Sequence, residues 1–341
     1  MSQTTGAGHG RPNRMIGENM VRIGIVGTNF ISEWFVAGAR RTAGRVEPVA
    51  VYSRSAERAE AFAQQEGIAR GFGDYEEMLD AVDAVYIASP TIAHHPQAMA
   101  AIEAGKHVLV EKTITQSLPE AEEIFAAAEK QGVVAMEAMR HLHTPDYRLL
   151  QDAIGRIGTI RYANIQKLQY SSRYDRFRAG EVLNAFKPEL GNSAIVDIGV
   201  YCLEPALDLF GVPISHTGHS VYLHNGFEGG GSIQFQYEQM IADVTYSKII
   251  GGVAPSTIIG EDGAVTIDMV GEPSLIELHG RDGKETLLEC APVHPSDTMQ
   301  HELLVFADQV ESGVTDPRWK NVTLQARRIM DEHLARTAPA K

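Results

Sequence analysis

The sequence predicts an α/β protein, in which an N-terminal doubly wound parallel sheet is followed by a C-terminal α/β domain with a large, open and mostly antiparallel sheet. Between residues 21 and 138, short apolar strands alternate with helices of roughly 10 to 15 residues, the pattern of a parallel sheet covered on both faces. Beyond residue 158, strand-like runs follow one another across Gly-rich or Asp-Gly turns, as in antiparallel sheets. At 341 residues the chain is also long enough for two domains of ordinary size.

The first domain is expected over residues 21–140. It opens with Val21–Ile31 (VRIGIVGTNFI), an apolar strand followed by a turn of small residues and the start of a helix. Before it, residues 1–20 are polar and Gly-rich and lack the apolar core of a signal peptide, so we interpret them as a flexible leader. The remaining strands are predicted at Val46–Tyr52, Asp83–Ala88, His107–Val110 and Val133–Met136, and the helices between them at 55–65, 74–79, 94–104 and 118–131.

The second domain is expected over residues 141–341, for substrate binding and oligomerisation. Helices are predicted at 145–154, 194–210, 298–312 and 322–337, and strands at 159–169, 217–223, 232–236, 241–249, 264–269, 274–279 and 285–290. These helices suffice for one face of the sheet only, so the other face is either polar or buried against another subunit. We expect the second, in a homodimer or homotetramer. The two C-terminal helices are candidates to pack back on the first domain.

Composition narrows the class of protein. A formal net charge of −14 at pH 7 argues against a nucleic-acid or membrane-surface partner, because either would be repelled. No apolar run approaches the roughly 18 residues of a membrane span. The two cysteines, Cys202 and Cys290, fit no metal or redox spacing and are typical of a cytoplasmic enzyme with reduced thiols. His94 and His95 do not indicate a metal either, since adjacent helical side chains point about 100° apart.

The turn after the first strand indicates a nucleotide-binding site. Backbone N–H groups converge at such a turn, and the helix dipole favours a phosphate there. The dinucleotide-binding pattern G-x-G-x-x-G keeps only its first glycine in Gly27-Thr28-Asn29-Phe30-Ile31-Ser32. Asn29 is able to adopt the left-handed backbone conformation of a glycine, and Ser32 is small enough for close packing of helix and strand. Taken alone, the motif is equally compatible with a plain buried strand and turn.

Residues after the second strand bear on the choice of cofactor. Ser53 and Arg54 lie near the place where an acidic residue would bind the ribose of NAD, and Arg58 follows on the same side of the helix. A carboxylate repels a 2′-phosphate, whereas serine and arginine bind it with charge-assisted hydrogen bonds. We therefore expect NADP, with NAD as the alternative. The structural alternative is a solvated helix start with two surface arginines.

Four segments of the chain together carry a family likeness. They are the Gly27 turn, Ser89-Pro90-Thr91 with His94, the stretch from Gly105 to Lys112 (GKHVLVEK), and Asp197-Ile198-Gly199-Val200-Tyr201. Through them the chain, from Val21 to about Arg336, resembles the glucose–fructose oxidoreductase, inositol dehydrogenase and MocA (Gfo/Idh/MocA) family. The resemblance implies a Rossmann domain, NAD(P) as cofactor and a sugar or related polyol as substrate. It also implies that the residues at the cofactor include Ser89, Pro90, Thr91, His94, Glu111 and Lys112.

Two departures from the family pattern stand at the expected site. Thr113 replaces the proline of the family's Glu-Lys-Pro, so the turn after Glu111-Lys112 is less rigid or its peptide bond differs. Tyr201 stands where many members have a histidine. This variant resembles the branch of glucose–fructose oxidoreductase and dimeric dihydrodiol dehydrogenase, which implies that the tyrosine is the acid.

Reduction of a carbonyl needs a hydride from nicotinamide and a proton for the developing alkoxide. Asp197 and Tyr201 are four residues apart and share one face of a helix. A tyrosine with an ordinary pKa near 10 is a poor base at neutral pH. A lysine ammonium about 4 Å away favours the phenolate by roughly 4 kcal/mol at an effective dielectric constant of about 20, less the cost of desolvation. With the resemblance, we assign Tyr201 as general acid/base, Lys112 as the cation that tunes it and holds the substrate oxygen, and Asp197 as the group that orients the substrate hydroxyl or the lysine.

The sequence leaves alternatives open. One is a nucleotide-binding regulatory protein that has lost catalysis on the same fold; others are trans-dihydrodiol dehydrogenase-like activity and an oxidoreductase that retains its cofactor. His141 and His143 are either substrate contacts or part of a solvated loop. The basic stretch Ser171–Glu189 either clamps a substrate or a neighbouring subunit, or forms a mobile lid.

Overall fold

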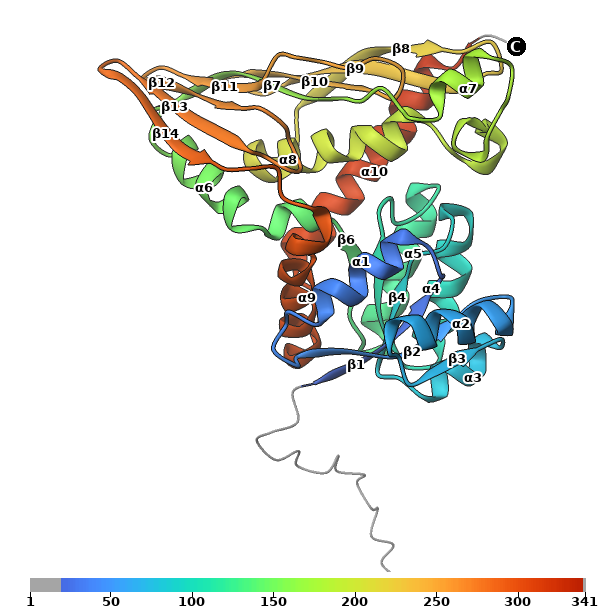
Figure 1. Ribbon diagram of the computed structural model, residues 1–341. Helices are drawn as coiled ribbons and strands as arrows, with labels where there is room; N and C mark the ends of the chain where they lie inside the picture. Colours follow the sequence, from blue (N-terminus) through green and yellow to red (C-terminus); the bar gives the residue numbers. More distant parts are fainter. Residues whose placement is uncertain (1–19, 340–341) are drawn as a thin grey trace, which may run out of the picture.

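The computed structural model describes residues 20–339, and two sheets organise them (Figure 1). The predicted leader, apart from Met20, lies outside the described residues. Every pairing in the first sheet is parallel, so the predicted doubly wound parallel sheet is confirmed. A strand at 70–72 was not predicted, because three residues are too few to show a period. In the spatial order of the sheet, the strands are β3 (Arg70–Phe72), β2 (Val46–Tyr52), β1 (Val21–Val26), β4 (Ala84–Ile87), β5 (His107–Glu111) and β6 (Ala135–Ala138).

Helices cover both faces of this sheet; they are α1 (Phe30–Ala39), α2 (Ala56–Glu66), α3 (Tyr75–Asp80), α4 (His94–Glu103) and α5 (Leu118–Gln131). Local signals set their ends. Ser55 caps the start of α2 through its side chain, and Gly132 ends α5 in the left-handed conformation. Side chains alternate along β4, because successive residues of a strand point to opposite faces. Tyr86 joins the core on the α1 side, whereas Val85 and Ile87 join the core under α3, α4 and α5.

The second sheet has eight strands, and within the described residues only the pairing of β10 with β7 is parallel. The expected mostly antiparallel sheet is therefore confirmed. One strand, at 256–260, was not predicted, because its five residues directly follow the Gly- and Pro-containing stretch 251–255. In spatial order the strands are β14 (Gly283–Glu289), β13 (Leu275–Gly280), β12 (Gly263–Ile267), β11 (Ser256–Gly260), β7 (Ile160–Leu168), β10 (Ile241–Ser247), β9 (Glu228–Gln236) and β8 (Ser215–Tyr222).

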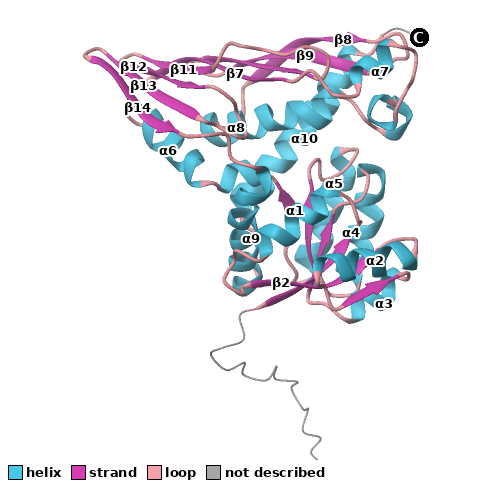
Figure 2. Cartoon of the chain, in the orientation of Figure 1, coloured by secondary structure: helices cyan, strands magenta, loops and turns pink. Residues whose placement is uncertain are grey.

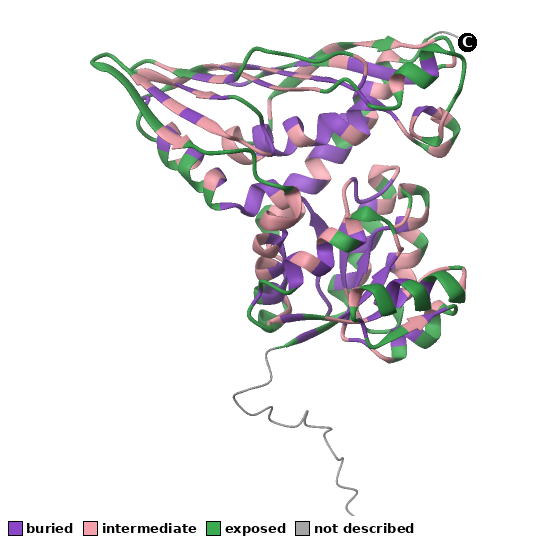
Figure 3. Ribbon diagram, viewed as in Figure 1, coloured by how far each residue is buried: buried purple, intermediate pink, exposed green. Residues whose placement is uncertain are grey.

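Helices cover one face of the second sheet (Figure 2), and they are α6 (Pro145–Ile154), α8 (Val200–Phe210) and α10 (Pro317–Thr337). Figure 3 shows α8 and much of α10 buried beneath the strands. The opposite face carries polar side chains that bond to one another: Tyr162 donates to Asp243 Oδ2 at 2.9 Å, and Gln234 Nε2 donates to Asp243 Oδ1 at 3.1 Å. Of the two possibilities for this face, its side chains favour the polar one. The homo-oligomer stays a prediction.

The helix α9 (Pro295–Ser312) returns from the second sheet to the first, where Phe306 belongs to the same core as Phe35 of α1. The helix α10 contacts both parts. Its Met330 lies in the core of the second sheet, and Asp331 Oδ2 accepts a hydrogen bond of 2.7 Å from the backbone N–H of Leu118, at the start of α5. These contacts hold the carboxyl ends of β5 and β6 near the first turn of α8, the region in which the sequence predicts the site.

A buried pair of carboxyl groups lies where the two sheets meet. Glu137 of β6 and Glu204 of α8 are 5% and 2% exposed, and the Glu204 carboxyl donates a hydrogen bond to Glu137. Burial, the neighbouring charge of Glu137 and this hydrogen bond raise the pKa of Glu204 well above the ordinary glutamate value. Glu204 is therefore protonated in the folded protein at neutral pH.

We expect Glu204→Gln to flatten the pH dependence of stability. As the pH rises above about 5, the unfolded chain releases a proton that folded Glu204 retains, so the free energy of unfolding of the wild type falls by up to about 1.4 kcal/mol per pH unit. Glutamine holds no such proton, yet it still donates to Glu137. Thermal unfolding near pH 5.5 and pH 8 measures the effect, with a smaller fall in Tm expected for the variant. An equal fall in both proteins would contradict a protonated Glu204.

Candidate active site

The turn between β1 and α1 is built around Gly27 and Asn29. Gly27 has a φ of +117°, and a Cβ there would lie 3.0 Å from the Ala88 carbonyl oxygen, so glycine is required. Asn29 Oδ1 accepts the backbone N–H groups of Ile31 (3.0 Å) and Ser32 (3.3 Å), and its Nδ2 donates to Ala88 O at 2.8 Å. The predicted left-handed conformation of Asn29 is wrong. Its φ of −110° is extended, because the side chain caps α1.

The groups around this turn fit a dinucleotide. The backbone N–H groups of Thr28 and Phe30 have no partner among the described residues, and they lie at the N-terminal end of α1, where a phosphate is stabilised. The Phe30 and Ile31 side chains line a cavity that continues toward the second sheet. Arg54 and Arg58 are exposed, and neither guanidinium makes an ion pair with another residue of 20–339. Both are therefore free to meet a 2′-phosphate.

The other predicted cofactor contacts lie in loops at the carboxyl ends of the strands. Ser53 Oγ, after β2, accepts the backbone N–H of Ser55 at 3.4 Å. Ser89 Oγ, after β4, donates to Gln97 Oε1 at 2.6 Å. Pro90 precedes a short 3-10 turn that begins at Thr91. All of them stand at the strand ends at which doubly wound sheets bind ligands.

His94 differs from the expectation. It is only 1% exposed, and both ring nitrogens lie near backbone oxygens: Nε2 is 2.8 Å from Ser89 O and Nδ1 is 3.1 Å from Thr113 O. Burial lowers the pKa of His94 below the ordinary histidine value. The ring therefore fastens the loop after β4 to the loop after β5, and its nitrogens are not presented to a ligand.

The turn after β5 carries Glu111 and Lys112. Tyr86 donates to Glu111 Oε1 at 2.5 Å, and the Glu111 Oε2 accepts the backbone N–H of Lys112 at 3.1 Å. The Lys112–Thr113 peptide bond is cis. Thr113 Oγ1 donates to Val196 O at 2.6 Å. The turn is thus attached directly to the segment that carries Asp197.

Asp197 bridges two lysines. It lies in a π-helical turn (Ile195–Gly199) just before α8, and π turns are often found at functional sites. Lys112 Nζ is 2.6 Å from Asp197 Oδ1 and 3.0 Å from its carbonyl oxygen, and Lys248 Nζ is 2.7 Å from Oδ2. Burial acts against both charges, but the ion pairs outweigh it: the pKa of Lys112 is raised and that of Asp197 is lowered. The group carries two positive charges and one negative charge, a net +1.

Tyr201, in the first turn of α8, lies near two ammonium groups. Lys112 Nζ is 5.1 Å and Lys167 Nζ is 4.0 Å from the centroid of its ring. Lys167, on β7, is paired with Glu272 at 3.3 Å, and Glu272 is also paired with Arg140. This second group again carries two positive charges and one negative charge. Two clusters of net charge +1 therefore flank the tyrosine.

The three residues assigned to catalysis line one cavity of about 490 Å³. It lies between α1, the ends of β5 and β6, the first turn of α8 and β7. Lys112, Asp197 and Tyr201 therefore meet as the sequence predicts, although their roles stay proposals. Other residues of its wall are Phe30, Ile31, Trp34, Glu111, Met139, Arg140, Lys167, Gln169 and Glu272.

Comparison with known proteins fits this geometry. Residues 21–139 match the Gfo/Idh/MocA family model, described as an oxidoreductase family with an NAD-binding Rossmann fold. The chain is 40% identical over 317 residues to scyllo-inositol 2-dehydrogenase (NADP+) IolU of Bacillus subtilis, an alignment that covers 92% of this chain and 96% of IolU. The chain belongs to the Gfo/Idh/MocA family of oxidoreductases.

Two further relatives agree. The chain is 30% identical to the trans-1,2-dihydrobenzene-1,2-diol dehydrogenase of Xenopus laevis, over 76% of this chain and 79% of that enzyme. Among solved structures, the 3-ketoreductase KijD10 of Actinomadura kijaniata, crystallised with NADP and TDP-benzene, superposes with a TM-score of 0.80. It is 25% identical, and the superposition covers 93% of this chain and 97% of KijD10. The resemblance to the family is confirmed, and the protein is an NAD(P)-binding oxidoreductase.

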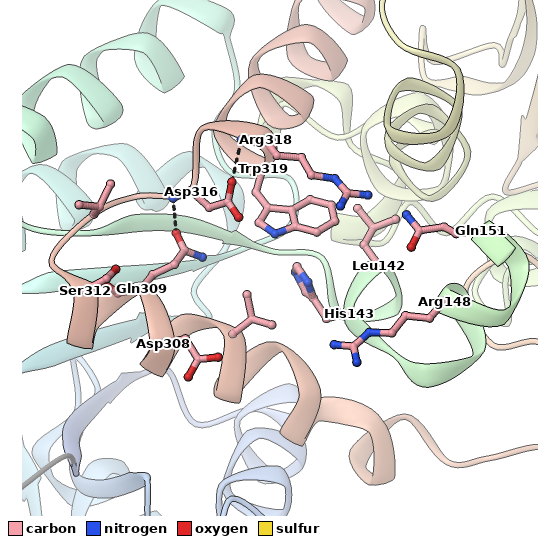
Figure 4. Close-up of a pocket in the computed structure, with 12 residues that line it drawn as sticks. Leu142, His143, Arg148, Gln151, Asp308, Gln309, Ser312, Asp316, Arg318 and Trp319 are labelled. Carbon is pink, nitrogen blue, oxygen red and sulfur yellow. Dashed lines mark hydrogen bonds between the residues drawn. The ribbon is translucent and has the colours of Figure 1, made fainter.

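A separate cavity of about 450 Å³ lies between α6, α9 and the start of α10 (Figure 4). None of the predicted catalytic or cofactor residues of this family member lines it. His143 faces this cavity, is 6% exposed, and has its pKa lowered to about 3, mainly by burial. Arg318, on the same wall, is held by both oxygens of Asp208 at 2.6 and 2.8 Å. His143 therefore lines a different cavity from Tyr201, and the solvated loop considered for it is wrong because the residue is buried.

The structure bears on two further predictions, one for His141 and one for the basic stretch 171–189. His141 is also buried, and its ring packs against that of Tyr201 with centroids 5.3 Å apart, so it is no part of a solvated loop. The basic stretch 171–189 folds over an aromatic cluster that includes Phe177, Phe186 and Phe227. Lys248 donates from that cluster's edge to Ala185 O at 3.3 Å. The stretch therefore packs beside Lys248, a residue of the site, and its role as a clamp or a lid stays a prediction.

Sequence reasoning missed Lys167, Lys248 and Glu272. Lys248 had a usable signal, because a lysine in the run Tyr246-Ser247-Lys248-Ile249-Ile250 interrupts a buried strand end. Lys167 and Glu272 had none, since each is one of many charged residues near a strand end. Within residues 20–339, no group of three or more His, Cys, Asp or Glu side chains is arranged to hold a metal ion. Nor is any helix of that part of the chain long and apolar enough to cross a membrane.

Proposed function

We propose that the protein is an NADP-dependent dehydrogenase or reductase of a sugar or cyclic polyol, in which Tyr201 is the general acid/base. One observation carries the proposal: the Tyr201 ring lies near the ammonium groups of both Lys112 and Lys167, in the cavity that Asp197 also lines. The class of substrate is supported by the relative at 40% identity, which is named a scyllo-inositol dehydrogenase. The cytoplasmic location expected from the sequence stays a prediction.

The two charged clusters place net positive charge near the Tyr201 ring. A single ammonium at 4 Å stabilises a phenolate by about 4 kcal/mol at an effective dielectric constant of about 20. A lone Lys–Asp pair would lose most of this, because the carboxylate cancels the ammonium. Lys248 and Arg140 restore a net positive charge to each cluster, since each supplies the second cation. Each cluster thereby contributes net positive charge beside the residue proposed as general acid/base.

The remaining residues of the site bind and orient the substrate. Bound NADP supplies the nicotinamide carbon that accepts or donates the hydride. Lys112 directs two N–H groups to oxygens of Asp197, which leaves its third donor for a substrate oxygen. In oxidation Tyr201 takes the hydroxyl proton as the hydride leaves, and in reduction it returns a proton to the developing alkoxide. Asp197 holds Lys112 in place through both contacts.

The experiment that tests the proposal is a screen for NADP+ reduction and NADPH oxidation with scyllo-inositol, myo-inositol, glucose and their keto derivatives. A trans-dihydrodiol is included because a relative at 30% identity is named for that activity. Turnover of a polyol with NADP+ is expected. Tight binding of NADP+ without turnover of any of these compounds would favour the regulatory alternative. Cofactor that survives extensive dialysis would indicate an enzyme that retains it.

We expect the double variant Arg54→Ala, Arg58→Ala to lose the preference for NADP+. Each guanidinium contributes about 1.5–3 kcal/mol through hydrogen bonds to a phosphate, so KM for NADP+ rises by at least about tenfold while KM for NAD+ changes little. Steady-state kinetics with both cofactors measures the ratio. Arg40→Ala, an exposed arginine at the other end of α1, is the control. An unchanged ratio in the double variant would remove these arginines from the cofactor site.

A further inference from the structure

A second compartment adjoins the active-site cavity on the far side of Lys167. Its volume is about 250 Å³, and its wall is formed by the end of β7, the loop before β11 and the loop after β12. Lys167, Gln169 and Glu272 line both spaces. The ion pair between Lys167 Nζ and Glu272 Oε2, at 3.3 Å, is therefore the partition between them. A volume of this size is below the roughly 300–1,000 Å³ that complete ligands occupy, which suits one part of a larger substrate.

The wall of the compartment combines polar groups with apolar surface. Gln169 is exposed, and its side chain makes no hydrogen bond with other residues of 20–339. Gln166 donates hydrogen bonds from its side-chain amide to Ala254 O and Pro255 O, at 2.8 and 3.1 Å, which leaves Oε1 as an acceptor. Met269, 50% exposed, contributes an apolar patch. Hydroxyls with an apolar C–H face, as on a sugar ring, match both kinds of surface.

The charge of the compartment does not favour phosphate. Its wall holds one ammonium, that of Lys167, and two carboxyl groups, those of Asp268 and Glu272. Burial opposes ionisation of Asp268, but hydrogen bonds from Ser274 and Leu275 lower its pKa, and Lys167 and Arg140 lower that of Glu272. Both are therefore carboxylates at neutral pH. Together with Lys167 and with Arg140, which is paired with Glu272, they give a net charge of zero. The compartment therefore offers a diphosphate no net positive charge, whereas an uncharged ring needs none.

We propose that this compartment is a second sugar subsite, and that the substrate class is a polyol carrying an uncharged glycosyl group. The inference rests on the proposed function, which sets the reacting ring beside Tyr201. The glycosyl ring then lies beyond the Lys167–Glu272 pair, within reach of Gln166, Gln169 and Met269.

The test uses two neighbouring tryptophan variants. Ala254 lines the compartment, whereas the adjacent Val253 is fully exposed and lines neither space. Ala254→Trp fills the compartment, and Val253→Trp adds the same side chain outside it. Both positions lie in an exposed loop, so both variants are expected to fold, and thermal unfolding checks this. The readout is the ratio of kcat/KM for galactosyl-myo-inositol to that for myo-inositol, with NADP+.

We expect the wild type to favour galactosyl-myo-inositol by about tenfold or more, the effect of one or two hydrogen bonds. Ala254→Trp should abolish this preference, and Val253→Trp should keep it. An equal ratio in all three proteins would overturn the inference, and so would binding of UDP-galactose that Ala254→Trp abolishes. Calorimetric binding of galactosyl-myo-inositol to the NADP+ complex gives the same comparison without turnover. Binding that depends on position 254 without hydride transfer would therefore contradict the proposed function and support the subsite.

Discussion

Tyr201→Phe is expected to lower kcat by at least about 10²-fold, the scale of general acid–base catalysis, while the affinity for NADP+ changes by less than about threefold. The substitution removes only the hydroxyl. The ring that Lys112 and Lys167 flank remains, and so do both charged clusters. Transient and steady-state measurements with the best polyol, together with fluorescence titration of NADPH, separate the loss of chemistry from any loss of binding.

The matched control for this prediction is Tyr162→Phe. Tyr162 lies on the polar face of the second sheet, and its hydroxyl donates to Asp243, so its loss should leave kcat unchanged. If Tyr201→Phe retains more than about a tenth of kcat, another group carries the proton. His141, whose ring packs on Tyr201, would then be the next residue to replace.

Lys112→Ala is expected to lower kcat by about 10²-fold or more. Its ammonium lies 5.1 Å from the centroid of the Tyr201 ring, and the variant also loses the donor to the substrate oxygen. Removal of Lys112 leaves Asp197 paired with Lys248 alone, so the net charge of that cluster falls from +1 to zero. The effect should appear mainly in kcat, because cofactor binding depends on the turn at Gly27 and on the arginines after β2.

Lys248→Met separates the effect of the cluster's charge from the effect of the contact between Lys112 and the substrate. It also takes the cluster from +1 to zero, but it leaves Lys112 in the cavity with its donor to the substrate. We therefore expect a loss in kcat that is measurable and smaller than that of Lys112→Ala, with KM little changed. A loss as large as that of Lys112→Ala would mean that Lys248 acts by holding the π-helical turn together. Full activity of Lys112→Ala would contradict its assignment altogether.

Much of the fold could be predicted from the amino-acid sequence. The alternation of apolar strands with capped helices up to residue 138 was sufficient for the parallel sheet, because parallel strands are buried on both faces and must be joined by crossover helices. Two strands were missed: β3 has only three residues, and β11 directly follows the Gly- and Pro-containing stretch 251–255. The motifs around Lys112 and Tyr201 line one cavity, and they were joined by the family pattern and not by their spacing.

Predictions from local sequence were wrong where a residue type can serve either the backbone or a ligand. Asn29 was expected to replace a glycine, yet its amide caps α1 and bonds to Ala88, a residue 59 positions away. His94 was expected at the cofactor, yet its two ring nitrogens lie near the backbone oxygens of Ser89 and Thr113, which are far apart in the sequence. In both cases the deciding partner lies in a loop that only the folded sheet brings near.

By itself, the sequence determined the α/β class, the family, the Gly27 turn and the trio of Lys112, Asp197 and Tyr201, since each depends on contiguous patterns or on a motif. The tertiary structure alone decided the electrostatics of the site. Lys167, Lys248, Glu272 and Arg140 come from four separate loops and strands, and nothing in their spacing pairs them. The sign of the electrostatic potential at Tyr201 depends on distances of a few ångströms among six charged groups, because the Coulomb energy falls with distance. Amino-acid composition contains no information about these distances.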